Sequence, residues 1–164
     1  MHTTLQRLIR LAVPAIATIG LFAASGAALA QSNARASVPN SPVGVWKSID
    51  DETGRAKALI TISDADGQLA GKIDKLIDPT EPDANPKCDK CSGARKGQPV
   101  VGMTILWGLK NEGEEWTGGE ILDPKNGKTY RAKLKLVDGG RKLEVRGFLG
   151  VALFGRTQTW VREP

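Results

Sequence analysis

Two cysteines lie two residues apart in the segment CDKCSG, which runs from Cys88 to Gly93. A C-x-x-C pair can provide half of a zinc site, act as a redox-active dithiol, or close into a small disulfide. A structural zinc ion needs four ligands, so a metal site would require carboxylates or a second copy of the pair. A redox-catalytic thiol usually has its pKa lowered by a helix N-terminus, and the glycines and proline that follow the pair prevent a helix. The choice among these three chemistries then depends on the compartment of the protein.

Histidine chemistry is absent from most of the chain, because the only histidine is His2. Without histidine, a Ser–His–Asp or Cys–His nucleophile and a His-ligated zinc or iron site are excluded. The glycine-rich patterns of phosphate and dinucleotide loops are also missing, and no spacing marks out a carboxylate pair. We therefore expect no enzyme activity, no cofactor and no metal site.

The first 30 residues have the layout of a secretory signal peptide. Arg7 and Arg10 precede an apolar run over residues 11–24, and Ala28-Leu29-Ala30 forms an A-x-A exit. A retained membrane anchor is the less favoured alternative, because the run is short for a span and no stop-transfer charges follow. We predict cleavage after Ala30 and a periplasmic or secreted protein with no integral membrane span.

In an oxidising compartment, two neighbouring thiols are expected to pair, which predicts a disulfide between Cys88 and Cys91. The enclosed loop is so short that the bridge would contribute only about 2 kcal/mol of stability. The pair lies within residues 78–99, a long stretch with four prolines and no strand pattern. Loops of this length often serve as lids or binding loops. We thus expect the bridge to shape this loop, with the redox and metal interpretations as alternatives.

The charge of the mature chain does not demand a nucleic acid partner. Removal of residues 1–30 reduces the 23 basic residues to 21, against 18 acidic residues. This modest positive balance fits solubility near anionic envelope surfaces, and secretion removes most nucleic acid from reach. We predict no nucleic acid binding, and the sequence does not indicate an oligomeric state.

After a polar lead-in over residues 31–42, residues 43–164 show strand patterns and no convincing helix. Asp66-Gly67, Asn126-Gly127 and Asp138-Gly139-Gly140 are hairpin signals. The predicted strands are Val43–Ser48, Ala56–Ser63, Leu69–Leu76, Val100–Trp107, Trp116–Asp123, Lys128–Val137, Arg141–Phe148 and Gln158–Arg162. A meander of about eight antiparallel strands tends to close, because closure removes exposed edges. We predict a single all-β barrel domain, either filled by side chains or wide enough for one small ligand.

Two strands carry further signals. In the strand over residues 128–137, Arg131, Lys133 and Lys135 share one face, which we interpret as a solvated outer surface, with an anion site as the alternative. In the strand over residues 116–123, Gly118-Gly119 indicates a bulge or the close approach of another backbone.

Gly44-Val45-Trp46 matches the G-x-W motif of lipocalin-like barrels, in which an arginine lies across the tryptophan at the barrel floor. Arg156 or Arg162 is the candidate for that arginine. The segments GVWKSIDDETGRAKA, CDKCSGARKGQPVVGMTILWGLK, GGEILDPKNGKTYRAKLKL and LEVRGFLGVALFGRTQTWVR, in this order, resemble a family of secreted bacterial proteins catalogued as domain of unknown function 2147. The resemblance covers residues 42–162 and implies a lipocalin-like fold and the same compartment.

The resemblance also marks positions, several of which have structural explanations such as turns and strand bends. These positions are Trp46, Asp123, Pro124, Gly127, Tyr130, Arg146, Gly147, Gly155, Arg156, Gln158 and Trp160. Arg146 and Arg156 lie in apolar company, so each needs an aromatic face or a carboxylate such as Glu120, or else binds the anion of a ligand. The candidate ligand-binding or barrel-closing residues are Trp46, Trp107, Tyr130, Arg146, Phe154, Arg156, Gln158 and Trp160.

The favoured function is a binding module for a small apolar or amphipathic ligand, with tryptophans in the pocket wall. The first alternative is a filled barrel that acts as an interaction protein at the envelope or a host surface. A thiol redox protein using Cys88 and Cys91 is the second. The size of the barrel interior distinguishes the favoured function from the first alternative, and the thiol state tests the second.

Overall fold

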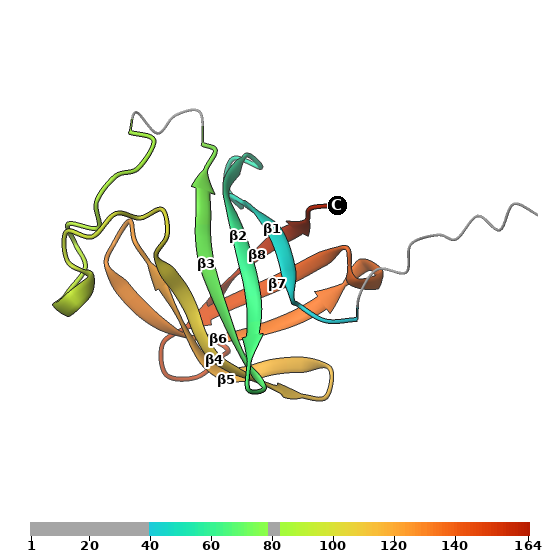
Figure 1. The fold of residues 1–164 in the computed structure, drawn as a ribbon. Helices are drawn as coiled ribbons and strands as arrows, with labels where there is room; N and C mark the ends of the chain where they lie inside the picture. The colour runs from blue at the N-terminus through green and yellow to red at the C-terminus, as the bar shows by residue number, and fades with distance from the viewer. Residues whose placement is uncertain (1–39, 79–82) are drawn as a thin grey trace, which may run out of the picture. The chain divides into compact units, whose positions relative to one another are not determined.

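The computed structural model describes residues 40–78 and 83–164 (Figure 1). Consecutive strands pair in antiparallel fashion, and the last strand returns to pair with the first, which closes an eight-stranded barrel. The strands are β1 (Gly44–Ile49), β2 (Ala56–Ala65), β3 (Gln68–Leu76), β4 (Thr104–Glu112), β5 (Glu115–Asp123), β6 (Lys128–Val137), β7 (Lys142–Phe148) and β8 (Gly155–Arg162). The predicted all-β meander barrel is therefore confirmed. The predicted signal peptide and residues 31–39 of the lead-in lie outside the described residues.

Regular helix is limited to two short 3₁₀ turns, η1 (Gly93–Arg95) and η2 (Asp138–Gly140), within the described ranges. No helix in these ranges is long and apolar enough to span a membrane. The antiparallel connections therefore consist of turns and loops, which alternate between the two ends of the barrel.

The local turn signals were predicted with the right chemistry. Asp66 and Gly67 both have positive φ, 56° and 76°, as the two central residues of a type I′ hairpin require. The β5–β6 turn is longer: the Gly127 N–H donates to the Asp123 carbonyl at 2.8 Å, and the Asp123 carboxylate accepts from the Lys125 N–H at 2.9 Å. In the first turn, Asp66 and Gly67 adopt the positive φ that the chain reversal requires. In the second, Asp123 accepts the backbone hydrogen bonds of the turn.

Three predicted strand boundaries were wrong by three residues or more, among them the end of β4, which lies at Glu112 instead of Trp107. Strand β4 begins at Thr104 instead of Val100, because Gly102 adopts a φ of 89° and turns the chain just before the strand. Val100 and Met103 are nevertheless buried, so their apolar side chains give the sequence a strand-like pattern before the strand begins. Strand β8 begins at Gly155, three residues earlier than predicted.

The glycine pair of β5 forms the predicted irregularity. The pairing register with β6 shifts between Trp116 and Gly119, and Gly118 has a φ of 78°. A Cβ at Gly119 would lie 2.3 Å from the Trp107 carbonyl oxygen, so only glycine lets the two strands approach this closely.

One end of the barrel is closed around Trp46, which is fully buried. Its indole N–H donates to the Pro42 carbonyl at 2.7 Å, and the Arg162 guanidinium lies 4.2 Å from the ring centroid. Arg162 also donates to the carbonyls of Val43 and Gly140, at 3.0 and 2.8 Å, and thereby ties both chain segments to the floor. Of the two arginines considered from sequence, Arg162 is the one stacked on this tryptophan.

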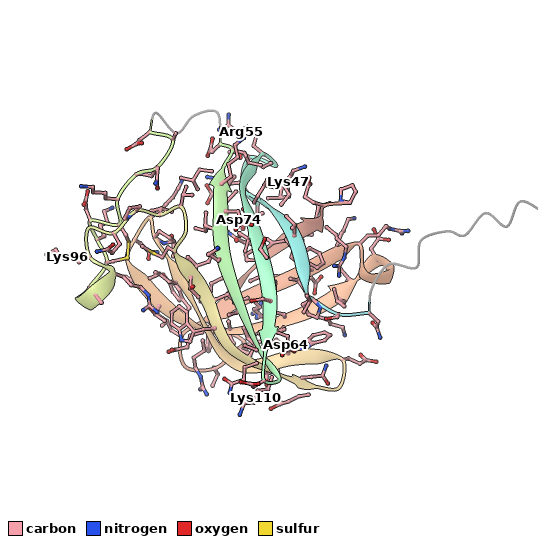
Figure 2. All side chains as sticks on the ribbon, viewed as in Figure 1. Lys47, Arg55, Asp64, Asp74, Lys96 and Lys110 are labelled. Carbon is pink, nitrogen blue, oxygen red and sulfur yellow. A yellow bond between two sulfur atoms is a disulfide. The ribbon has the colours of Figure 1, made fainter. Side chains whose placement is uncertain are left out.

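The side chains in Figure 2 mark the two ends of the barrel. Asp64 and Lys110 lie near the hairpins of the closed end, and Arg55 lies at the opposite end, in the β1–β2 loop. The basic face of β6 lies outside: Lys133 contacts Glu115 of β5 at 2.9 Å, and Lys135 contacts Glu114 at 3.4 Å. Exposed pairs of this kind add little stability, and they fit the interpretation of this face as a solvated outer surface.

Candidate functional site

An open cavity of about 900 Å³ occupies the end of the barrel opposite Trp46. Its rim is formed by the β1–β2, β3–β4, β5–β6 and β7–β8 connections. The apolar wall inside the barrel comes from Ala58, Ile60, Ile73, Ile105, Ile121, Val145 and Trp160. The closed end is instead filled by Trp46, Ile62, Leu69, Leu109, Leu134 and Leu143, all of which are buried and none of which lines the cavity. The barrel is thus filled at one end and hollow at the other.

Small inward-facing residues explain why the interior is hollow near the mouth. Ser48, Ala58 and Gly147 all line the cavity, where larger residues would fill it. Gly147 pairs with Ala132 and Arg156 in the β7 ladders. A Cβ at Gly147 would meet its nearest neighbour, an Ile121 side-chain carbon, at 3.4 Å, which is an ordinary van der Waals contact.

The few polar groups in the cavity wall have partners. The Ser48 hydroxyl accepts from the Ala58 N–H at 3.1 Å. The Tyr130 hydroxyl accepts a hydrogen bond from the Asn126 side-chain amide at 3.0 Å. The Gln158 side-chain oxygen accepts one from the Trp160 indole N–H at 3.4 Å. An apolar wall with a few placed polar groups is typical of small-molecule sites.

Within the β3–β4 connection, residues 86–100 form a small hairpin that borders the cavity. The Cys88 N–H donates to Gln98, and the Val100 N–H donates to Pro86, both at 2.9 Å. Cys88 and Cys91 form a disulfide at its tip, as predicted, and both residues are buried. Neither cysteine is a free thiol.

The disulfide tip packs on the β5–β6 turn, and the two segments lie side by side at the left of Figure 1. A Cβ on Gly127 would lie 1.9 Å from the Lys90 carbonyl oxygen and 2.8 Å from the Cys91 nitrogen. Gly127 therefore serves both the turn, through its φ of 72°, and this close contact. Sequence analysis found the first role and missed the second, because nothing local links residues 36 positions apart.

Arg146 holds the β7–β8 loop and does not line the cavity. Its Nε donates to the Ala152 carbonyl at 2.8 Å, and its Nη atoms donate to Thr157 Oγ1 at 2.8 Å and to the Leu153 carbonyl at 3.1 Å. With its donors used in this way, the guanidinium has a structural role. The loop that it holds presents apolar side chains to solvent, including Leu153 and Phe154, which are 80% and 75% exposed and extend the cavity wall outward.

Arg156 lines the cavity and is bound to the β1–β2 loop. Its Nε donates to Asp51 at 2.7 Å, a second guanidinium nitrogen also contacts Asp51, and Glu52 lies 3.5 Å away. Hydrogen bonding from Arg156 lowers the pKa of Asp51, and the carboxylate in turn raises the pKa of the guanidinium. The carboxylate partner suggested from sequence, Glu120, is therefore not the one used.

Lys57 joins the same rim from β2. Its ammonium lies 2.9 Å from Asp50 and 3.5 Å from Asp78. The hydrogen bond from Lys57, followed by those from Thr53, holds the pKa of Asp50 well below its ordinary value. Both aspartates of the β1–β2 loop, at positions 50 and 51, are thus ionised and paired at neutral pH.

The structure brings some predicted site residues together and separates others. Tyr130, Phe154, Arg156, Gln158 and Trp160 line the cavity. Trp46 lies instead at the floor of the barrel, and the Arg146 guanidinium holds the β7–β8 loop, as described above.

Trp107 does not line the cavity. Its indole N–H donates to exposed Glu120 at 3.0 Å, and Arg95 lies 4.4 Å from its ring centroid. Lys57, Lys125 and Val145 were not singled out from the sequence, and Gly147 was marked only with a structural explanation. The position of Val145 between the charged residues Glu144 and Arg146 indicates an inward side chain, whereas no local signal marks the lysines.

Comparisons with known proteins place this geometry in context. Residues 44–162 match the family model described as "Uncharacterized protein conserved in bacteria (DUF2147)". The fold is similar to that of protein HP1028 from the human pathogen Helicobacter pylori, which belongs to the lipocalin family. That similarity has a TM-score of 0.65 at 17% sequence identity and covers 76% of this chain and 84% of that one. No curated protein matches the sequence significantly. Within the described ranges, no group of three or more His, Cys, Asp or Glu side chains is placed to hold a metal ion.

Proposed function

This chain belongs to the bacterial family DUF2147, and we propose that its lipocalin-like barrel binds a small apolar or amphipathic ligand. The observation that carries the proposal is the cavity of about 900 Å³ at the open end of the barrel. Small-molecule sites commonly have volumes of roughly 300–1,000 Å³ and apolar walls with a few polar groups. Residues 48, 58 and 147 keep this space open, and Trp160 supplies an aromatic surface within it.

The position of the cavity favours a ligand that enters from the rim. The floor is sealed by Trp46, so the ligand would lie with its apolar part toward Ile60, Val145 and Trp160. Burial of apolar surface would supply most of the affinity, at about 25 cal/mol per Å² removed from water. The exposed Phe154 would cover the part of the ligand nearest the mouth.

The alternatives have less support. A fully filled barrel would have no interior volume, whereas here only the closed end is packed. A thiol redox role is disfavoured because both sulfurs are in a buried disulfide and only the single 3₁₀ turn η1, with no α-helix, follows the pair. We therefore retain ligand binding as the function.

We propose further that the protein acts in the periplasm or outside the cell, after cleavage behind Ala30. The basic start, apolar run and A-x-A exit of the N-terminal segment support this, as does the disulfide, which persists in oxidising compartments. Intact mass spectrometry of the protein from a periplasmic extract should give a chain that begins at Gln31, with a mass two hydrogens below the reduced form. A full-length chain in the cytoplasmic fraction would contradict this assignment.

The proposed binding can be tested with N-phenyl-1-naphthylamine, a neutral apolar dye that fluoresces more strongly away from water. We expect a saturable rise in dye emission together with quenching of tryptophan emission, because Trp160 lines the cavity. Heat-unfolded protein is the control for non-specific binding. Emission that rises linearly without saturation would favour the filled-barrel alternative.

A further inference from the structure

The cations around the mouth of the cavity form two groups with different partners. On the β1–β2 side, Lys57 and Arg156 are each bound to carboxylates. On the opposite side, the β3–β4 segment and the β5–β6 turn contribute Lys87, Lys90 and Lys125 to the lining. In the part of the chain that the structure describes, none of these three lysines forms an ion pair.

The lining carboxylates on the second side do not neutralise these lysines. Asp123 is used within its own turn, where its two oxygens accept hydrogen bonds from the Lys125 N–H at 2.9 Å and the Asn126 amide at 2.8 Å. Asp89 lies between two of the lysines in sequence and is exposed. This side of the mouth therefore carries an excess of positive charge.

Lys125 also shares the cavity with the cation on the other side. Lys125 and Lys57, which projects from β2, both line it. Positive charges that line one cavity repel one another unless anions lie beside them. Asp50 and Asp78 lie beside Lys57 and form ion pairs with it, whereas Lys125 forms no ion pair with a carboxylate among the described residues.

We propose that the ligand is an amphiphile with an anionic headgroup, which binds beside Lys87, Lys90 and Lys125 while its apolar chain enters the cavity. This inference rests on the proposed function and adds the chemical class of the ligand. A carboxylate or phosphate there would supply the negative charge that these lysines lack. The apolar wall formed by Ile60, Ile73 and Val145 begins directly below the rim and suits an alkyl chain.

Competition for bound N-phenyl-1-naphthylamine tests the headgroup separately from the pocket. Dodecanoate, dodecyl phosphate, dodecanol and dodecylammonium have the same chain and differ only in the head. At pH 8 and low salt, we expect both anions to displace the dye at concentrations about 3- to 10-fold lower than dodecanol, with dodecylammonium the weakest. The preference should shrink at high salt, because exposed charges are screened.

Charge reversal at one lysine provides the matched comparison. Lys125→Glu should weaken dodecanoate competition about 10-fold and leave dodecanol competition unchanged. Lys128→Glu is the control, because Lys128 is also exposed, lies three residues away, and does not line the cavity. Equal competition by dodecanol and the anions, or equal effects of the two variants, would overturn the anionic headgroup while leaving the pocket intact. Failure of the dye and all four amphiphiles to bind would instead overturn the proposed function.

Discussion

A Gly147→Phe variant is expected to bind N-phenyl-1-naphthylamine at least about 10-fold more weakly than the unchanged protein. Gly147 lines the cavity, and a Cβ built on it meets its nearest neighbours, on Ile121 and Tyr130, at 3.4 and 3.6 Å. These are ordinary van der Waals contacts with side chains that also line the cavity, so a larger side chain at this position would extend along the cavity wall. The phenyl ring would occupy volume that the ligand needs.

Gly147→Ala is the control for this substitution, because it adds only the Cβ and should leave dye affinity within about 3-fold. Thermal unfolding followed by circular dichroism should show both variants folded, since overpacking is costly only in cores that are already full. Unchanged dye binding by a folded Gly147→Phe protein would show that the ligand lies elsewhere.

A Trp46→Ala variant is expected to lose about 3–5 kcal/mol of unfolding free energy, the usual cost of truncating a fully buried aromatic side chain. The substitution removes the floor of the barrel, the hydrogen bond to the Pro42 carbonyl and the aromatic face beneath Arg162. Urea unfolding monitored by circular dichroism measures the difference. The barrel holds a stack of other buried residues above this floor, so a loss of this size leaves a measurable transition.

Trp107→Ala provides the matched control, because Trp107 also lies beneath an arginine but is only partly buried. We expect it to cost about 1 kcal/mol, mainly through the lost contact with Arg95. Equal destabilisation by the two substitutions would contradict the assignment of Trp46 as the structural floor.

The strands could be predicted from sequence because their determinants are local. Alternation along β6 and the Asp66-Gly67 turn each involve residues a few positions apart, and the physics of hairpins acts at that range. The G-x-W motif predicted that Trp46 closes the floor of the barrel. It also limited the arginine stacked on this tryptophan to Arg156 or Arg162. The disulfide followed from spacing and compartment together.

The site was predicted less well because it depends on distant contacts. Arg146 appeared as a possible anion site, yet its donors are satisfied by backbone carbonyls of a loop that no periodicity describes. Trp107 was a candidate to line or close the barrel, but the register of its strand with β3 shifts around it, and Gly108, the next residue, has a positive φ of 75°. A bulge changes which face of the sheet a side chain takes, so simple alternation fails beyond it.

The hollow interior of the barrel could not be predicted from the sequence either. It results from small residues on three different strands that line one cavity, namely Ser48, Ala58 and Gly147. Each of them is unremarkable in its own segment. Only the closed pairing of β1 with β8 turns these separate positions into one cavity.

Native mass spectrometry of the mature protein, taken from the periplasm without refolding, tests the ligand-binding account most directly. The unchanged protein and the Gly147→Phe variant should be prepared in parallel, and each should be sprayed under native and then denaturing conditions. If the cavity binds a ligand, the native unchanged protein carries a non-covalent adduct that is lost on denaturation, is absent from the variant and has a mass that fits an anionic amphiphile. A bare native ion for the unchanged protein that also fails to take up added dodecanoate or dodecanol would contradict the account.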